Sequence, residues 1–146
     1  MITVRLSCLS DGAFFLCEAA GHAGFEAFGK DIVCASVTAI LRTAMRVLSE
    51  CDGITLDWSA KKRGELAFCA KAAEKVPAAE KSMSAENSMP DGMSVLQYTA
   101  RFIRAGIQSI VQEYPNNVNF EEKLCVEEKF EAKRNLSFAK IEKSRN

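Results

Sequence analysis

The sequence predicts an α+β fold, with an antiparallel sheet of two hairpins plus a short edge strand, packed with two long amphipathic helices. Two pairs of alternating segments, each joined by a turn, predict the hairpins. Two segments with apolar residues at helical spacing predict the helices. The 146 residues are 48% hydrophobic and 26% charged, which is typical of one globular domain.

The first hairpin is expected at residues 2–20. Residues 2–9 alternate as in a half-buried strand, whose inner face would carry Ile2, Val4, Leu6 and Cys8. An Asp-Gly turn at residues 10–12 leads into a second strand at residues 13–20. The next ten residues, 21–30, include three glycines and have no regular period, which predicts a loop.

A long helix is expected after this loop, with Asp31 as its N-cap. Its apolar face would be formed by Ile32, Val33, Val37, Ile40, Leu41, Ala44, Val47 and Leu48. Asp52 and Gly53 should end the helix, because glycine readily adopts the left-handed conformation of a C-cap.

The second hairpin is expected at residues 54–71. Its first strand, residues 54–60, should point Ile54, Leu56 and Trp58 inward, with Trp58 in the core. A second strand at residues 65–71 follows a charged turn that we interpret as solvated, formed by Lys61, Lys62, Arg63 and Gly64.

The rest of the chain should contain a linker, a helix, a short strand and a tail. Residues 76–92 hold two prolines and predict a mobile linker. A second helix, with Pro115 after it, is expected from about Ser94 to Tyr114, with an apolar face of Val95, Leu96, Phe102, Ile103, Ile107, Ile110 and Val111. Val118–Phe120 would be an edge strand.

The expected domain is 1–120, and half of residues 121–146 are charged, as in an appended tail. The pattern leaves open whether the helices share one face of the sheet.

Composition and charge exclude several classes of protein. Nineteen basic and nineteen acidic residues cancel, so direct binding to nucleic acid through a global charge is not expected. No apolar run approaches the roughly 20 residues of a membrane span, and no signal peptide is evident, so we expect a cytosolic protein without a membrane interaction. The six cysteines form no C-x-x-C motif and should be reduced and mostly buried.

His22 and Cys34 are the residues that predict chemistry. His22 is the only histidine, and Cys34 lies in the first turn of the expected helix. Free backbone N–H groups and the helix dipole favour a thiolate there, and the same N–H groups would suit an oxyanion. A histidine within reach would act as general base. Taken alone, each residue is more often structural, and a metal site of Cys17, His22 and Cys34 lacks a fourth ligand.

The local sequence resembles one family closely. The matching segments are Gly21-His22-Ala23-Gly24-Phe25 and Gly29-Lys30-Asp31-Ile32-Val33-Cys34-Ala35, followed by Val37. They resemble the signature of the ribosomal-processing cysteine proteases (Prp). Ser36 replaces a usual alanine or glycine, and Thr38 replaces serine while keeping a hydroxyl. The resemblance extends from residue 1 to about residue 120 and gives the tail no role.

The resemblance implies a homodimeric cytosolic endopeptidase that removes the N-terminal extension of a large-subunit ribosomal protein. It implies that Cys34 is the nucleophile and His22 the general base, with support from Asp31 and Thr38. Asp31 is most simply the helix cap, and the alternative role for it is to position His22. The residues expected in a loop that opens and closes over the peptide are Gly21, Ala23, Gly24, Phe25 and Gly29.

Two further expectations concern the surroundings of this site. Phe25 and Phe28 would either line a cleft or be buried. No cofactor and no metal are expected. The alternative to an enzyme is a non-catalytic binding module for the same ribosomal protein or for the ribosome surface.

Overall fold

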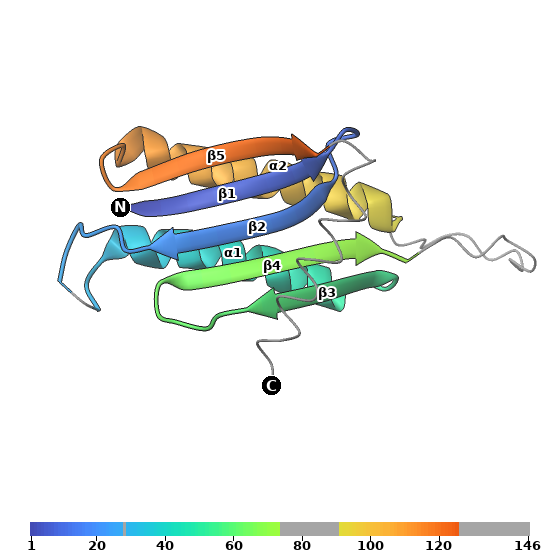
Figure 1. The fold of residues 1–146 in the computed structure, drawn as a ribbon, viewed down its shortest axis with the longest axis horizontal. Helices are drawn as coiled ribbons and strands as arrows, with labels where there is room; N and C mark the ends of the chain where they lie inside the picture. Colours follow the sequence, from blue (N-terminus) through green and yellow to red (C-terminus); the bar gives the residue numbers. More distant parts are fainter. Residues whose placement is uncertain (28, 74–90, 126–146) are drawn as a thin grey trace, which may run out of the picture.

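The described part of the chain, residues 1–27, 29–73 and 91–125 of a computed structural model, folds into five strands and two helices (Figure 1). The strands are β1 (Ile2–Leu9), β2 (Phe14–Gly21), β3 (Ile54–Ser59), β4 (Glu65–Ala72) and β5 (Val118–Cys125). The helices are α1 (Ile32–Glu50) and α2 (Gly92–Glu113). Phe28, most of the predicted linker and tail residues 126–146 lie outside the described residues.

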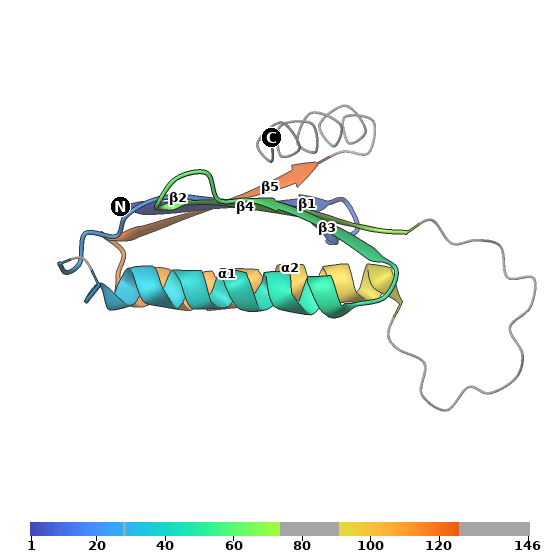
Figure 2. The ribbon, with the colours of Figure 1, turned by 90° about the horizontal axis from the view of Figure 1, so that it is seen from below.

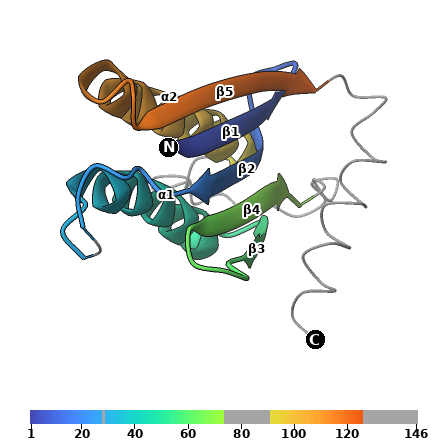
Figure 3. The same ribbon diagram turned by 60° about the vertical axis from the view of Figure 1, so that its left-hand side comes forward.

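The sheet is mixed, with the strand order β3-β4-β2-β1-β5. The predicted hairpins β1–β2 and β3–β4 are antiparallel, and β2 and β4 join them in antiparallel pairing. The prediction of an antiparallel sheet is wrong for β5, which runs parallel to β1 (Figure 3). The cause is α2, which returns the chain to the end of the sheet where β1 begins.

The edge strand β5 is eight residues long, not the predicted three, and continues past the boundary expected at residue 120. The sequence does not indicate the full length of β5, because Glu122 breaks the alternating pattern. Glu122 lies on the inner face of β5, where an alternating strand would carry an apolar residue. The guanidinium of Arg104 in α2 forms an ion pair with the Glu122 carboxylate. This pair lets a charged residue occupy the inner face near the sheet edge.

Both helices cover the same face of the sheet, which settles the arrangement that the sequence left open (Figure 2). Phe14 of β2 and Phe68 of β4 stack in the core with ring centroids 5.3 Å apart. Each fully buried side chain of this size contributes roughly 1.5–3 kcal/mol through removal of apolar surface from water. The helices close the core with Val33, Val37, Leu41, Ala44 and Leu48 from α1, and Leu96, Ala100, Ile103 and Ile107 from α2.

Four residues predicted in the apolar core are exposed instead. Trp58 shares a face with Phe68 but is 45% exposed, because β3 is an edge strand and has no neighbour beyond it. Ile32, Val47 and Phe102 are also exposed, at the margins of their helices' apolar faces. The periodicity therefore identified the correct faces but overestimated their width.

Helix α1 is 19 residues long with a mean hydropathy of 1.5, so length and composition alone would also allow it to cross a membrane. This contradicts the expectation that no segment would do so. The buried stripe of α1 packs in the core beneath the sheet, as the core helix of a folded domain does.

Candidate active site

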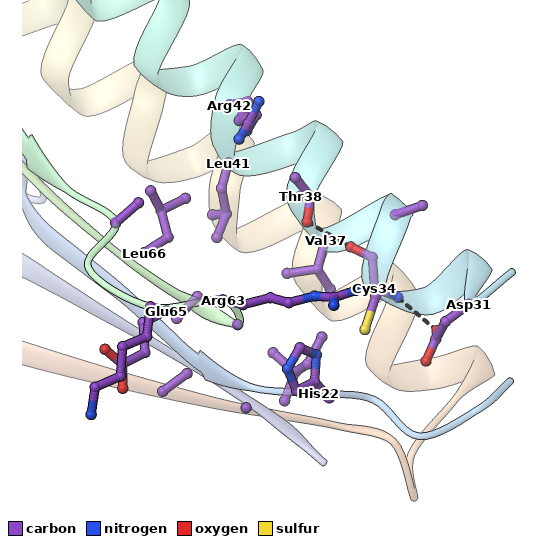
Figure 4. Close-up of a pocket in the computed structure, with 18 of the residues that line it drawn as sticks. His22, Asp31, Cys34, Val37, Thr38, Leu41, Arg42, Arg63, Glu65 and Leu66 are labelled. Atoms are coloured by element: carbon purple, nitrogen blue, oxygen red, sulfur yellow. Dashed lines mark hydrogen bonds between the residues drawn. The ribbon is translucent and has the colours of Figure 1, made fainter. Parts of the chain in front are cut away.

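A pocket of about 1100 Å³ opens between the first half of α1, the end of β2 and the β3–β4 hairpin. His22 and Cys34 both line this pocket. Figure 4 shows the His22 ring and the Cys34 sulfur directed into the same space, one from the loop after β2 and the other from α1. The structure therefore brings together the two residues that the sequence singled out.

Cys34 is held at the start of α1 by the predicted N-cap. The Asp31 side chain accepts a 2.9 Å hydrogen bond from the Cys34 N–H through Oδ1, which confirms the cap. Val33 and Val37 point into the core, so helical geometry places the half-buried Cys34 on the flank of α1 that faces the hairpin.

Asp31 also ties the loop to the helix. Its Oδ2 accepts a 3.2 Å hydrogen bond from the Phe25 N–H. Desolvation, the largest single effect, would raise the pKa of this carboxyl, but the hydrogen bonds from the Cys34 and Phe25 N–H groups together outweigh it and hold the pKa below its ordinary value. Asp31 therefore stays ionised and joins the segment carrying His22 to the helix carrying Cys34.

The Ala23 peptide makes the most direct contact with the thiol. Its N–H donates to Cys34 Sγ at 3.3 Å. Its carbonyl oxygen accepts a 2.9 Å hydrogen bond from the Asn117 side-chain amide, just before β5. Ala23 is only 4% exposed, so both bonds lie in a part of the site largely closed to water.

His22 lies against the β3–β4 hairpin. A Cβ added to Gly64 would come within 2.7 Å of His22 Nε2, and Gly64 has a φ of +77°. The Gly64 carbonyl accepts a 2.9 Å hydrogen bond from the Gly21 N–H. Gly21 is itself close-packed, since a Cβ there would stand 2.4 Å from the Met1 carbonyl oxygen. Glycine is thus needed at position 64 to leave room for the imidazole, and at position 21 for the close approach of the Met1 backbone.

The charged hairpin turn belongs to the site. Lys61, Lys62 and Arg63 are exposed, as predicted, but they also line the pocket with Arg42 of α1. Figure 4 shows the Arg63 side chain extending from the hairpin toward Val37 and Cys34. No pattern in the sequence indicates this placement, because the turn meets His22 only through the pairing of β4 with β2.

The other predicted site residues have varied positions. The Thr38 hydroxyl faces its own helix and donates to the Cys34 carbonyl at 2.8 Å. Gly24 and Gly29 line the pocket. Phe25 is outside the lining, and its ring packs edge-on against Tyr114 with centroids 5.1 Å apart. The proposed cleft role of Phe28 lies outside the described residues.

The remaining cysteines differ from Cys34 in burial. All six are free in the structure. Burial raises the pKa of Cys8 to about 11 and that of Cys69 to about 12, and it raises the pKa of Cys17 further. Cys17 lies fully buried in β2, away from the pocket, so the alternative metal site with His22 and Cys34 does not form. Only Cys34 and Cys51 are partly exposed.

This arrangement is suited to nucleophilic attack by sulfur. The thiol has an N–H donor that would stabilise a thiolate, and an imidazole lines the same pocket. One expectation needs correction: the Cys34 N–H is not free to hold an oxyanion, because it donates to Asp31. The Ala23 N–H, aimed at the reacting sulfur, is the better-placed donor.

Comparisons with known proteins agree with this chemistry. The family model described as cysteine protease Prp matches residues 1–119. A comparison with curated proteins finds no match. The fold resembles that of an essential ribosomal processing protease Prp from Staphylococcus aureus with a covalently linked product peptide: 21% identity, 84% of this chain and 100% of that chain covered, TM-score 0.64.

Two further structures share the fold. The Staphylococcus aureus Prp structure with a substrate peptide is 20% identical, with 84% of this chain and 100% of that chain covered and a TM-score of 0.60. The crystal structure of a Streptococcus mutans protein is 20% identical, with 86% and 96% coverage and a TM-score of 0.59.

Proposed function

Because the chain belongs to the family of the cysteine protease Prp and is a cysteine protease, we propose that Cys34 is its nucleophile and His22 its general base. The observation that carries this proposal is the shared pocket, in which Cys34 is the lining cysteine and His22 the lining histidine. Family membership favours this enzymatic function over the non-catalytic binding module considered above.

The proposed reaction is acyl transfer to sulfur followed by hydrolysis. His22 takes the thiol proton, and Cys34 Sγ attacks the carbonyl carbon of the scissile peptide bond, so that a C–S bond forms. The C–N bond then breaks, and the His22 imidazolium gives its proton to the leaving amine. Water, deprotonated by His22, cleaves the thioester and releases a carboxylic acid and the free thiol.

The Ala23 N–H supports two stages of this reaction. Before attack it donates to sulfur and favours the thiolate. After attack the substrate oxygen is attached to the carbon that sulfur has bonded, so the same N–H lies beside the developing oxyanion. Removing one such donor typically costs about 10²–10³ in kcat in acyl-transfer enzymes.

As substrate, we propose the N-terminal extension of a large-subunit ribosomal protein, cleaved by a homodimer in the cytosol. The support for a peptide substrate is the open pocket along α1 and the fold shared with a ribosomal processing protease that binds a substrate peptide. An extended peptide fits between α1 and the hairpin, because the pocket follows one flank of the helix from Asp31 to Arg42.

Alanine variants of Cys34 and Cys51 test the nucleophile. Both thiols are partly exposed and both belong to α1 or its C-cap, so Cys51→Ala is a matched control for Cys34→Ala. Cleavage of a peptide spanning the extension should vanish in Cys34→Ala and persist in Cys51→Ala. One equivalent of iodoacetamide at neutral pH should label Cys34 first. A fully active Cys34→Ala enzyme would refute the assignment.

A further inference from the structure

The Ala23 peptide is bound on both sides by residues from distant parts of the chain. Its N–H meets Cys34 Sγ at 3.3 Å, and its carbonyl accepts the Asn117 side-chain amide at 2.9 Å. The Ala23 N–H and the Ala23 carbonyl belong to two successive planar peptide units that meet at the Ala23 Cα. Anchoring the carbonyl therefore restricts where this Cα lies, and the Ala23 N–H on its other side can reach Cys34 Sγ only from a narrow range of positions. Asn117 thereby controls how the loop meets the thiol.

We propose that Asn117 is a positioning residue of the protease, which holds the Ala23 backbone so that the Ala23 N–H donates to Cys34 Sγ. This inference rests on the proposed function, since it gives Asn117 a role in preparing the Cys34 nucleophile. It connects the segment before β5 to a site otherwise built from the loop, α1 and the hairpin.

Asn117 is itself held firmly enough to act in this way. Its backbone N–H donates to the Tyr114 carbonyl at 3.0 Å, and its backbone carbonyl accepts a 2.8 Å hydrogen bond from the Ile2 N–H. These two bonds fix the Asn117 backbone between the end of α2 and the start of β1. The side chain therefore presents its amide from a rigid base.

The burial of Ala23 makes the contact with Asn117 hard to replace. Ala23 is 4% exposed, so solvent has little access to its carbonyl if the amide donor is removed. A buried carbonyl without a partner is destabilised, and the Ala23 backbone is expected to shift until this carbonyl finds another donor. A shift of the Ala23 Cα would withdraw the Ala23 N–H from sulfur and reduce the stabilisation of a thiolate.

The rest of the loop has attachments that do not depend on Asn117. The Phe25 N–H donates to Asp31 Oδ2, and the Phe25 ring packs on Tyr114. The Gly21 N–H donates to the Gly64 carbonyl. Replacement of the Asn117 side chain should therefore change the local orientation of Ala23 and leave the fold in place.

The variants Asn117→Ala and Asn117→Asp test the proposal. Alanine removes the donor, whereas aspartate keeps the size but places a carboxylate against the Ala23 carbonyl. Asn119→Ala is the matched control, because Asn119 lies two residues further along and its amide donates to Glu121 instead. Thermal unfolding establishes that each variant is folded.

The readout is the pH dependence of Cys34 alkylation by iodoacetamide, without substrate and in a Cys51→Ala background. The charged or titratable groups that line the pocket with Cys34 are unchanged in all variants: His22, Glu26, Asp31, Arg42, Lys61, Lys62, Arg63 and Glu65. In both Asn117 variants we expect the midpoint of the alkylation rate against pH to shift upward by about one pH unit. This is equivalent to a roughly tenfold slower alkylation of Cys34 at neutral pH. Asn119→Ala should match the parent.

Peptide cleavage gives the second readout. We expect kcat to fall about tenfold in Asn117→Ala, with KM changed less than about twofold, because the donor acts on the reacting atoms. Folded Asn117 variants with the parent's alkylation profile would overturn the inference and leave the Cys34–His22 proposal intact. Retained cleavage in Cys34→Ala would refute the proposed function, whatever the alkylation profile shows.

Discussion

His22 acts, in our proposal, as both base and acid, so its removal should alter the pH dependence as well as the rate. We expect His22→Ala to lower kcat/KM by about 10²–10⁴ and to abolish the loss of activity on the acid side of the profile. The profile belongs to the Cys34–His22 pair, not to either residue alone. Initial rates of peptide cleavage between about pH 5 and 9 measure it. An unchanged rate and profile would remove His22 from the mechanism.

Gly64 determines whether the imidazole can occupy its place. Gly64→Ala would put a methyl group within 2.7 Å of His22 Nε2 and 2.9 Å of the Gly21 carbonyl oxygen, so the ring must move. We expect kcat/KM to fall at least about tenfold.

Gly12→Ala is the control for Gly64→Ala. Gly12 also has a positive φ, +81°, but a Cβ there meets nothing within 4 Å. Both variants should lose roughly 1 kcal/mol of stability through backbone strain, and only Gly64→Ala should lose activity. Equal kcat/KM values in the two variants would contradict the proposed seat of the imidazole.

At the residue scale, the sequence predicts what is local. His22, Asp31 and Cys34 fall within one short segment, so a loop followed by a helix start was enough to bring them near one another. Gly64 and Asn117 could not be found in this way, because both are distant in sequence from His22 and Cys34. Gly64 reaches the site through the pairing of β4 with β2, and Asn117 through the connection between α2 and β5. No periodic pattern marks a single side-chain amide that binds a loop carbonyl.

At the element scale, alanine variants of the two N-caps should distinguish an effect on stability from an effect on activity. Asp31 caps α1, and Asp91 caps α2 through a 2.7 Å hydrogen bond from the Ser94 N–H. Replacing either cap with alanine should lower the free energy of unfolding by about 1 kcal/mol. Only Asp31→Ala should also reduce kcat/KM, by about tenfold, because Asp31 additionally holds the Phe25 N–H. Denaturant unfolding and peptide cleavage measure the two effects.

The Asp31 cap should also weaken in acid. Its folded pKa lies below the ordinary value of 3.8, so its contribution is fully present above the unfolded pKa and is lost as pH falls through the folded pKa. The difference in melting temperature between wild type and Asp31→Ala should therefore be constant near neutral pH and shrink below about pH 4. A difference that grows in acid would contradict this reading of the cap.

The sequence largely predicted the helices and strands themselves, but it did not predict which distant elements β5 contacts. Alternation and helical spacing located both hairpins and both helices to within about two residues. The direction of β5 was not accessible, because β5 pairs with β1 and not with a strand close to it in sequence. Glu122 concealed the second half of β5, since its partner Arg104 lies in another element.

At the scale of the whole molecule, the place of a truncation decides its outcome. Because β5 runs to Cys125, a chain ending at that residue keeps all five described strands and should retain kcat/KM within about threefold. A chain ending at Asn116 loses β5, the buried Val118 and Asn117, and should not fold stably. Circular dichroism and peptide cleavage distinguish these results. A folded but inactive chain ending at Cys125 would place the later residues in the active site.

Size-exclusion chromatography of the full chain and of the chain ending at Cys125 tests the proposed homodimer. The full chain should elute at twice its mass of 16.0 kDa. A fully active monomer of the full chain would refute the dimer as a requirement for catalysis. A change of mass on truncation at Cys125, with activity retained, would assign assembly to the residues after 125.

During translation, β1 is the first strand to be synthesised, but its partner β5 is the last of the described strands. Arg5 of β1 and Glu121 of β5 form an ion pair across 116 residues of chain, so this part of the sheet has a high contact order. The ribosome releases His22 and Cys34 well before it makes Asn117. A nascent chain thus carries both proposed catalytic side chains while Ala23 still lacks its anchor. If Asn117 acts as we propose, full proteolytic activity is reached only after β5 has joined β1.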